Sequence, residues 1–471
     1  MKNLFSKKFT KKDFFLTVLL TMFCFTNHQS FANIKKVKTA FDIITLPNII
    51  NTNTTLTPNN TYLLNGKVVV KNNAVLTIEP GTRILAIYKD TPSQVSALII
   101  TRGSKIQAVG TANNPIIFTG RIDATNPVLS FGDWGGIIIL GNAPTNKPAT
   151  TIIEGINATT LPVGVTNSDV SYGGNNSNDN SGTLSYVRVE YAGAVISPNN
   201  EINSFTFGGV GSGTIIDHLQ AYRSGDDSFE FFGGNVNGKY LISTAANDDA
   251  FDFDNGYTGK LQFLVAVLNP NAPFSFDPNA IESDNDETGS NATPITRPII
   301  SNLTIVGTAN GASNIIGSGV LNGITIRRNS DMVLYNSIVY GFRKAILNFT
   351  PQSVLIENNI IGTLPASVAI APFPSFIEGI ASNVTMSTSN NIVETNAIGL
   401  RIVNPFQFIG FFNNAFRSLR PTAPPTTTGA NFDDDLSDSF FIPTFYKGAI
   451  SPINNESFYW IGGNWVNKFL L

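Results

Sequence analysis

The stretch Asp226-Asp-Ser-Phe-Glu-Phe231 decides the fold, because it recurs as Asp248-Asp-Ala-Phe-Asp-Phe253 after 22 residues. The same interval separates Asn336 from Asn358. It also aligns Leu219, Leu241 and Phe263, and it places Leu76-Thr-Ile-Glu-Pro-Gly-Thr-Arg-Ile84 on Leu98-Ile-Ile-Thr-Arg-Gly-Ser-Lys-Ile106. A fixed period of about 20 to 50 residues is typical of repeat proteins. The interval therefore predicts a chain built from one repeated structural unit.

Each repeat contains short stretches of alternating residues such as Val187-Arg-Val-Glu190, broken by Gly, Asn or Asp. Such stretches indicate strands. A unit with two or three of them fits one coil of a parallel β-helix, in which each strand pairs with its equivalent in the next coil. The consensus of leucine-rich repeats and the Trp-Asp signals of propellers are absent. We therefore predict an all-β fold, a single-stranded right-handed parallel β-helix with about 22 residues per coil.

Composition excludes other classes. The 471 residues carry a net charge of -3, and only 13% are charged against 42% hydrophobic. This balance lacks the basic footprint of a nucleic-acid-binding protein, so we expect no nucleic-acid partner. The 40 Gly and 25 Pro do not suit a helical bundle. Residues 33–471 have room for roughly 10 to 15 coils in one domain, with long insertions at about 143–182, 269–298 and 418–439.

The first 32 residues read as a secretory signal peptide. Five Lys residues precede an apolar run from Phe14 to Phe25, and Ser30-Phe-Ala32 offers small residues for cleavage. The run is too short to span a bilayer, and we expect no transmembrane segment in the mature chain. Lipidation at Cys24 is an alternative, but the bulky residues Met22 and Phe23 precede Cys24 where lipoprotein processing requires small residues. We expect export to the periplasm, the cell surface or the medium.

Equivalent residues of successive coils should stack. We expect Phe205, Phe229 and Phe251 to form one interior column, and Phe207, Phe231 and Phe253 a second. Asn has both donors and acceptors and tolerates left-handed turns, so Asn336 and Asn358 are expected to form a ladder. Trp460 and Trp465 are expected to cap the last coil, where an exposed strand edge would invite aggregation.

The two acidic repeats are the densest polar feature. If Asp226 lies over Asp248, Asp227 over Asp249 and Glu230 over Asp252, stacked like charges destabilise the sheet unless something offsets them. A bound Ca²⁺ would do so, because it takes six to eight oxygen ligands. We therefore predict a calcium site formed by Asp226, Asp227, Glu230, Asp248, Asp249 and Asp252. The alternatives are acids that cap turns, or neutralisation by Arg223, Lys239 or Lys260.

Catalysis is a further alternative for the same carboxylates. Paired acids on a β-helix suggest glycoside hydrolysis, and a lyase would use Ca²⁺ with an Arg or Lys base. The candidate residues are Asp226, Asp227, Asp248 and Asp249. The Gly-His-Gly and Arg-Ile-Lys segments of polygalacturonase-like enzymes are absent. His218, the only mature histidine, is expected on a strand face.

Four residues are candidates for ligand binding. Arg223 lies beside the acidic repeats, and Arg327 and Arg328 could hold a sugar acid or phosphate bidentately, although an Arg facing turn carbonyls or acids is the alternative. Trp134 is either a platform on which a sugar stacks or a wedge at a coil corner.

Several segments resemble a known family. The segments are Leu76-Thr-Ile-Glu-Pro-Gly81, Gly132-Asp-Trp-Gly-Gly-Ile-Ile-Ile-Leu-Gly-Asn-Ala143, Tyr186-Val-Arg-Val-Glu-Tyr-Ala-Gly193 and Ser224-Gly-Asp-Asp-Ser-Phe-Glu-Phe-Phe-Gly-Gly234. They resemble exported Gram-negative β-helix proteins, many of them lipoproteins. The resemblance implies an exported β-helix and assigns no catalytic residue. We expect a non-enzymatic protein whose loops bind glycan or another cell-surface component, with a polysaccharide lyase or hydrolase as the alternative.

Overall fold

The computed structural model describes residues 42–156, 160–197, 200–269, 274–275, 277–307, 322–342, 344–350, 352, 354–362, 377–379, 386–387, 390–394, 401–402, 419–453 and 460–468. The chain divides into residues 1–42 and a compact unit of residues 43–471. The predicted signal peptide, with Cys24, lies outside the described residues.

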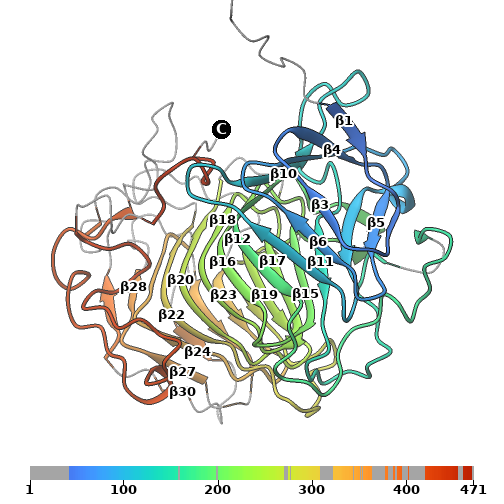
Figure 1. Ribbon diagram of the computed structural model, residues 1–471. Coiled ribbons are helices and arrows are strands. Elements are labelled where there is room, and N and C mark those ends of the chain that lie inside the picture. Colours follow the sequence, from blue (N-terminus) through green and yellow to red (C-terminus); the bar gives the residue numbers. More distant parts are fainter. Residues whose placement is uncertain are drawn as a thin grey trace, which may run out of the picture. The chain divides into compact units, whose positions relative to one another are not determined.

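The compact unit is a right-handed parallel β-helix with three strand faces, as predicted. One face is an 11-stranded sheet (Figure 1). We call it the third face because, in most coils, its strand comes later in the sequence than the strands of the other two faces. Its strands are, in order, β2 (Ile49–Ile50), β5 (Lys67–Val70), β8 (Ala97–Ile100), β11 (Ile137–Leu140), β15 (Phe205–Val210), β17 (Phe229–Gly234), β19 (Phe251–Asp254), β21 (Ile281–Ser283), β23 (Asn322–Ile326), β26 (Lys344–Asn348) and β29 (Ile377–Gly379). Eleven strands fall within the predicted number of coils.

The first and second faces form one 18-stranded sheet. Five long strands run through the corner between these faces and lie side by side in Figure 1: β12 (Gly182–Glu190), β16 (Ile215–Tyr222), β18 (Asn237–Thr244), β20 (Lys260–Val267) and β22 (Ile299–Val306). The other strands of the first face are β3 (Thr54–Leu56), β6 (Val75–Ile78), β9 (Lys105–Val109), β24 (Val333–Tyr335), β27 (Val354–Glu357) and β30 (Met386–Ser387). Those of the second face are β1 (Asp42–Thr45), β4 (Asn60–Leu64), β7 (Arg83–Ala86), β10 (Ile116–Gly120), β25 (Ile338–Tyr340), β28 (Ile360–Gly362) and β31 (Ile392–Glu394). Outside the coils lie β13 (Val195–Ser197), β14 (Asn200–Glu201) and the short 3-10 helices η1 (Pro92–Gln94) and η5 (Asp434–Leu436).

The core fills the space inside the coils, and phenylalanine columns occupy its middle. Phe205 pairs with Phe229 and Phe229 with Phe251, with ring centroids 5.0 and 5.3 Å apart. The second predicted column, Phe207, Phe231 and Phe253, stacks in the same way. Both predicted columns are confirmed, because parallel pairing puts identical positions of successive coils one strand spacing apart.

From β12 onward, the corner between the first and second faces places one residue of each coil at positive φ. The residues are Tyr186, His218, Tyr240, Phe263, Asn302, Asn336, Asn358 and Asn390, with φ between 52° and 61°. The first four stack as aromatic rings, and the ring centroid of His218 lies 4.3 Å from that of Tyr186 and 4.4 Å from that of Tyr240. In the later coils Asn358 Nδ2 donates to Asn336 Oδ1 over 2.7 Å, which confirms the predicted ladder. Asn tolerates this left-handed conformation better than most residues.

Replacing Asn336 by Ala should destabilise the protein by about 2 to 4 kcal/mol. The side chain is fully buried, donates to Asn431 O over 2.7 Å, and accepts from Asn358. Ala would remove these bonds and remain at φ 53°. Chemical denaturation measures the loss. Asn73→Ala is the control, because Asn73 has φ 59° but is exposed; equal losses in the two variants would mean that the ladder adds nothing.

The alignment of Leu76 with Leu98 was wrong. Leu76 pairs with Thr54 and with Ile106 on the first face, whereas Leu98 pairs with Val68 on the third. The two segments look alike because Gly81 and Gly103 each turn the chain at φ near +80° between two strands, although at different corners. The alignment of Leu241 with Phe263 is off by one residue: Leu241 pairs with Leu264, and Phe263 stacks on Tyr240.

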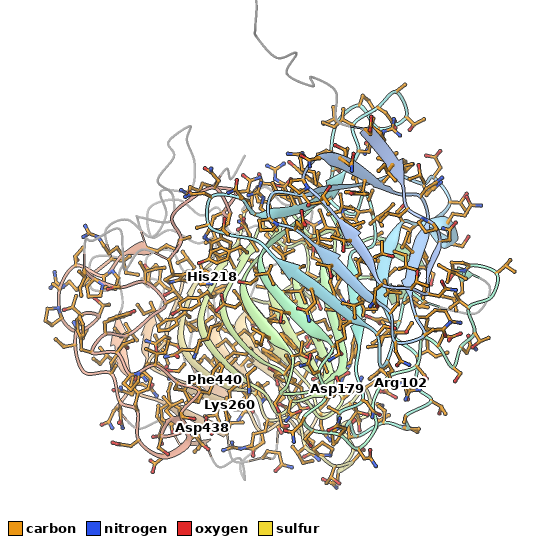
Figure 2. All side chains as sticks on the ribbon, in the orientation of Figure 1. Arg102, Asp179, His218, Lys260, Asp438 and Phe440 are labelled. Atoms are coloured by element: carbon orange, nitrogen blue, oxygen red, sulfur yellow. The ribbon has the colours of Figure 1, made fainter. Side chains whose placement is uncertain are left out.

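The long connection from β11 to β12, residues 141–181, covers the outside of the third face. Its Ile153, Val170 and Tyr172 are buried in one cluster with Val69 and Ile99 of that face. Arg102 anchors the connection by donating to Ser171 Oγ over 2.6 Å and Gly173 O over 2.9 Å (Figure 2). This connection is therefore packed, and part of it forms a second layer.

The stretch 269–298 is only partly an insertion. Ile281–Ser283 within it form β21, in register with Phe251, Asp252 and Phe253. The strand has three residues and is flanked by Pro, Asn and Asp, so its sequence carries no alternation long enough to reveal it.

The C-terminal segment does not cap the last coil. Trp465 is fully buried with Ile242 and Val265 of β18 and β20, and its ring meets Tyr186 and His218 edge-on. Gln220 and Asn467 exchange two hydrogen bonds across 247 positions of the chain. The described part of 419–453 also follows the outside of the coils, where Asn431 bonds to Asn336. The expectation for Trp460 and Trp465 is thus wrong: they cover the aromatic corner in the middle of the helix.

Candidate functional site

The acidic residues gather on and beside the third face. Glu230, Asp252 and Glu282 occupy equivalent positions of β17, β19 and β21, so they form a column on the outer side of this face. Residues 141–181 and 277–298 cover much of it, and Glu230 is 5% exposed. The predicted stacking of like charges is present.

Asp227 and Asp249 have a structural role. Asp227 N–H donates to Asn203 Oδ1 over 3.2 Å, Asp249 N–H to Asp227 Oδ1 over 2.8 Å, and Asn279 N–H to Asp249 Oδ1. Each side chain thus accepts a backbone bond from the next coil. The two acids are therefore structural, but they join successive coils instead of capping turns through their own backbone, and one oxygen of each is committed to the fold.

Asp226 and Asp248 instead face an open cavity. It has a volume of about 830 Å³ and is also lined by Tyr88, Phe131 and Asn247 among others. Asn247 is 7% exposed, and its Oδ1 has no hydrogen-bond partner. Four further acids line it: Asp90, Asp133, Glu201 and Asp277. The cavity therefore combines several carboxylates, an amide oxygen free to bind a cation, and two aromatic side chains against which a sugar ring could stack.

Two groups of carboxylates have the spacing of a cation site. Asp226, Asp227 and Asp248 each offer an oxygen, and these oxygens lie within 4.8 Å of one another. Asp227, Glu230 and Asp252 form the second group, and Asp252 Oδ1 is buried without a hydrogen-bond partner. All-oxygen donors of this kind suit Ca²⁺. Five of the six predicted ligands fall in these groups. Asp249 falls in neither group.

Burial and mutual repulsion raise the pKa values throughout the cluster. Burial, followed by the charge of Asp248, raises the pKa of Asp226 well above its usual range. The pKa of Glu154 is raised to about 7 by burial and by Glu201, and that of Asp254 to about 7, mainly by burial. The pKa of Glu282 is raised to about 8 by burial and by Asp284. These acids favour protonation or a bound cation.

Arg327 and Arg328 neutralise the far end of the cluster. Arg327 Nε donates to Asp284 Oδ1 over 3.0 Å and its Nη2 pairs with Glu282, while Arg328 Nη1 donates to Asp284 Oδ2 over 2.7 Å. Asp284 is 4% exposed. The arginines thus bind neighbouring acids, and the predicted role in ligand binding is corrected to this one.

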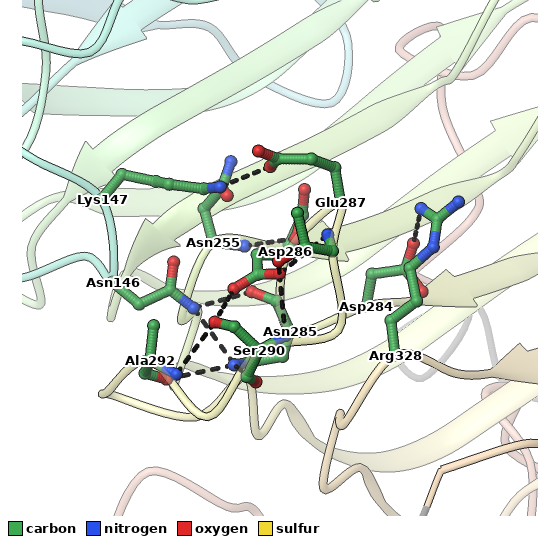
Figure 3. A network of polar contacts seen from close by, with 12 residues as sticks. Asn146, Lys147, Asn255, Asp284, Asn285, Asp286, Glu287, Ser290, Ala292 and Arg328 are labelled. Carbon is green, nitrogen blue, oxygen red and sulfur yellow. Dashed lines mark hydrogen bonds and ion pairs between the residues drawn. The ribbon is translucent and has the colours of Figure 1, made fainter.

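A polar network joins the two loops that cover the acidic column (Figure 3). Lys147 pairs with Glu287, and Asn146 Nδ2 donates to Asn285 O over 2.7 Å. Asp286 accepts from Thr288 and Ser290 and so closes the turn between them. The network fixes the loops over the third face while leaving Asp226 and Asp248 at the cavity.

The other predicted residues are placed differently. Trp134 is fully buried, stacks on Phe118 at 6.4 Å and donates to Glu190 O over 2.9 Å. It is therefore the wedge and is inaccessible to a sugar. Arg223 lies over the ring of Phe131, 5.7 Å from its centroid, and its buried Nε has no hydrogen-bond partner. Arg223 is thus close to the cavity, because Phe131, whose ring it lies over, lines that cavity.

Lys239 and Lys260 do not neutralise the acidic coils. Lys260 pairs with Asp438 (Figure 2). Lys239 Nζ lies 4.2 Å from the ring centroid of Phe440. His218 contacts Asp217 at the aromatic corner and does not line the cavity.

Sequence reasoning missed acids that come from outside the repeat. Glu201 and Asp277 line the cavity, and Glu154 acts electrostatically on Asp226 and Glu230. The long connections bring these residues there. No periodic signal marks them, and only their acidity within long polar stretches could have suggested them.

The comparisons with known proteins agree with the fold. A family model described as a pectate-lyase-like β-helix domain matches residues 48–397. No curated protein and no solved structure matches the chain. Among the described residues, no helix has the length and apolar character needed to cross a membrane.

Proposed function

Since this chain belongs to the pectate-lyase-like β-helix domain family, we propose that it binds carbohydrate with the help of a Ca²⁺ held in its acidic cavity. The observation that carries the proposal is the opening of Asp226 and Asp248 onto a cavity that also exposes Tyr88 and Phe131. A Ca²⁺ on Asp226, Asp227 and Asp248 would relieve their repulsion and keep coordination positions for hydroxyl or carboxylate oxygens of a sugar.

Binding without catalysis fits the roles of the acids. Two of the four candidate catalytic residues, Asp227 and Asp249, already hold backbone N–H groups of the next coil. The arginine nearest the acidic column, Arg327, is held by Glu282 and Asp284. Of the four candidates, only Asp226 and Asp248 line the cavity, and this pair suits a cation site better than a complete catalytic set.

The proposal also includes export of the protein from the cytoplasm. Residues 1–32 carry the pattern of a signal peptide, and the segments quoted above resemble exported Gram-negative proteins. We place the protein outside the cytoplasm, where a glycan of the cell surface or the surroundings would be its partner. Expression with and without residues 1–32, followed by fractionation, tests this location.

The central test measures glycan binding with and without calcium. Purified protein is titrated with polyuronides and neutral glycans by calorimetry, and Asp248→Asn should lower the affinity of the calcium-dependent ligand about tenfold or more. Asp438→Asn is the matched control, because Asp438 is exposed and pairs with Lys260 far along the side of the coils. Binding that is indifferent to both Ca²⁺ and Asp248→Asn would contradict the proposal.

A hydrolase or lyase is the second candidate. One observation favours it: the adjacent carboxyls of Asp226 and Asp248 have raised pKa values, as a general acid requires. The same glycan panel is therefore scored for cleavage. Cleavage that Asp226→Asn abolishes would replace the binding function with the enzymatic one.

A further inference from the structure

We propose that the protein cleaves its own chain at the peptide bond between Asp277 and Pro278, beside the acidic cavity. Asp277 lines that cavity and its side chain is 53% exposed, whereas Pro278 is buried. These two residues are the only Asp-Pro pair among the 471 residues. The inference is independent of the proposed carbohydrate binding, because the reaction needs neither a glycan nor a cation.

The reaction uses the side chain of Asp277 as nucleophile. Its carboxyl oxygen reaches the main-chain carbonyl carbon of the same residue through a five-membered ring, so the two reacting atoms are held together by the residue itself. Attack forms a cyclic anhydride and breaks the bond to the Pro278 nitrogen, which takes the carboxyl proton and leaves as a secondary amine. A tertiary amide nitrogen accepts that proton more readily than other peptide nitrogens. One water then hydrolyses the anhydride, so Asp277 ends with two carboxyl groups.

Asn279 provides a hydrogen-bond donor at the scissile bond. Its Nδ2 donates to the carbonyl oxygen of Asp277 over 2.9 Å, and this oxygen becomes negative when the carboxyl attacks. The other hydrogen of Nδ2 is directed to Glu282 Oε2 over 3.4 Å. Thr325 Oγ1 donates to Asn279 Oδ1 over 2.7 Å, which fixes the orientation of the amide, and Asn279 is fully buried. A buried donor that is oriented in advance is well suited to stabilise an oxyanion.

The two parts of the chain would stay together after cleavage. β19 precedes the bond and pairs with β21 after it, and β20 likewise pairs with β22. Gln220 and Asn467 exchange hydrogen bonds across the same division of the chain. The product is therefore a folded, nicked protein, which separates at residue 277 only when it is unfolded.

Incubation of the purified full chain at mildly acidic pH tests the inference. Denaturing electrophoresis and mass spectrometry should show two fragments, of which the second begins at Pro278, while the native mass rises by one water. The folded protein should be cleaved about a hundredfold faster than the same protein unfolded in urea. The unfolded chain keeps the Asp-Pro bond but loses the oriented donor of Asn279, so this ratio measures what the fold contributes.

Two variants separate the nucleophile from the donor. Asp277→Glu keeps the negative charge 3.6 Å from Arg327 Nη1 but would have to form a larger ring, so its cleavage should fall to the rate of the unfolded chain. Thr325→Val removes the hydroxyl that orients Asn279, and it should slow cleavage of the folded protein about tenfold while the rate in urea stays unchanged. The bond between Glu79 and Pro80 is exposed and should remain intact throughout.

Three results would overturn the inference. The first is a folded wild-type protein that yields no fragment beginning at Pro278. The second is an unfolded chain that is cleaved as fast as the folded one, because the bond would then be labile without help from the fold. The third is an Asp277→Glu protein that is cleaved as fast as the wild type. The melting temperature of each variant is measured alongside, so that a loss of cleavage is scored only for folded protein.

Discussion

Raising the pH from about 5 to about 8 in the absence of calcium should destabilise the protein, by on the order of 3 kcal/mol from Asp254 alone. Its folded-state pKa is raised to about 7, as is that of Glu154, and the pKa of Glu282 is raised to about 8. The folded state therefore holds more protons than the unfolded state between these pH values. Stability from such groups is complete below the unfolded pKa near 4 and is lost as the pH rises through 7 to 8.

Asp226, Asp227 and Asp248 add to this pH dependence, because burial raises their pKa values as well. Calcium should remove the part that comes from these three acids, because a cation bound to them replaces their protons, whereas the part from Asp254 should remain. Thermal unfolding is followed at several pH values with EDTA or with excess Ca²⁺. Asp227→Asn keeps the oxygen that accepts Asp249 N–H but removes one charge, so it should stabilise the calcium-free protein at pH 8. A melting temperature that rises with pH in EDTA, or that ignores Ca²⁺, would show that the cluster is neutralised in another way.

Replacing Phe231 by Ala should cost about 3 to 5 kcal/mol of unfolding free energy. Phe231 is fully buried and stacks between Phe207 and Phe253, with ring centroids 5.0 and 5.4 Å away, and Tyr257 packs against it at 4.8 Å. The cavity would open in the middle of a column that coils on both sides share, so the neighbours cannot close it without shifting strands. Chemical denaturation measures the loss.

Phe445→Ala is the control for this substitution, because its side chain is 52% exposed. Its effect should stay within about 0.5 kcal/mol, as expected for surface positions. Similar losses at Phe231 and Phe445 would mean that the interior column is no more important than peripheral packing.

The fold was predictable where equivalent residues are chemically alike. Phe229 and Phe251 occupy the same position of successive coils, as do Asn336 and Asn358. The residue type repeats because each side chain packs against or bonds to the equivalent side chain of the adjacent coil. The prediction went wrong at Leu76 and Leu98, since every corner of a coil joins strand to turn to strand and a segment can be aligned with the wrong corner. A strand as short as Ile281–Ser283 is defined by its neighbours in adjacent coils, and a local pattern cannot reveal it.

The candidate site was predictable only in part for a related reason. The repeat located Asp226, Asp227, Asp248 and Asp249, but adjacent Asp residues look identical in sequence. The backbone turn decides that Asp227 accepts a bond from the next coil while Asp226 opens to the cavity. Glu201 and Asp277 reach the cavity from connections without any repeat, so no sequence pattern marks them.

The return of the C-terminal segment to the middle of the helix has a consequence for how the chain folds. Coils that touch only their neighbours can form one after another as the chain is synthesised. The bonds between Gln220 and Asn467 span 247 positions, so they must wait until residue 467 is made. Until then the aromatic rings of Tyr186, His218 and Tyr240 lack the cover of Trp465, so we expect a chain that has not yet reached this residue to be more prone to aggregation than the folded protein.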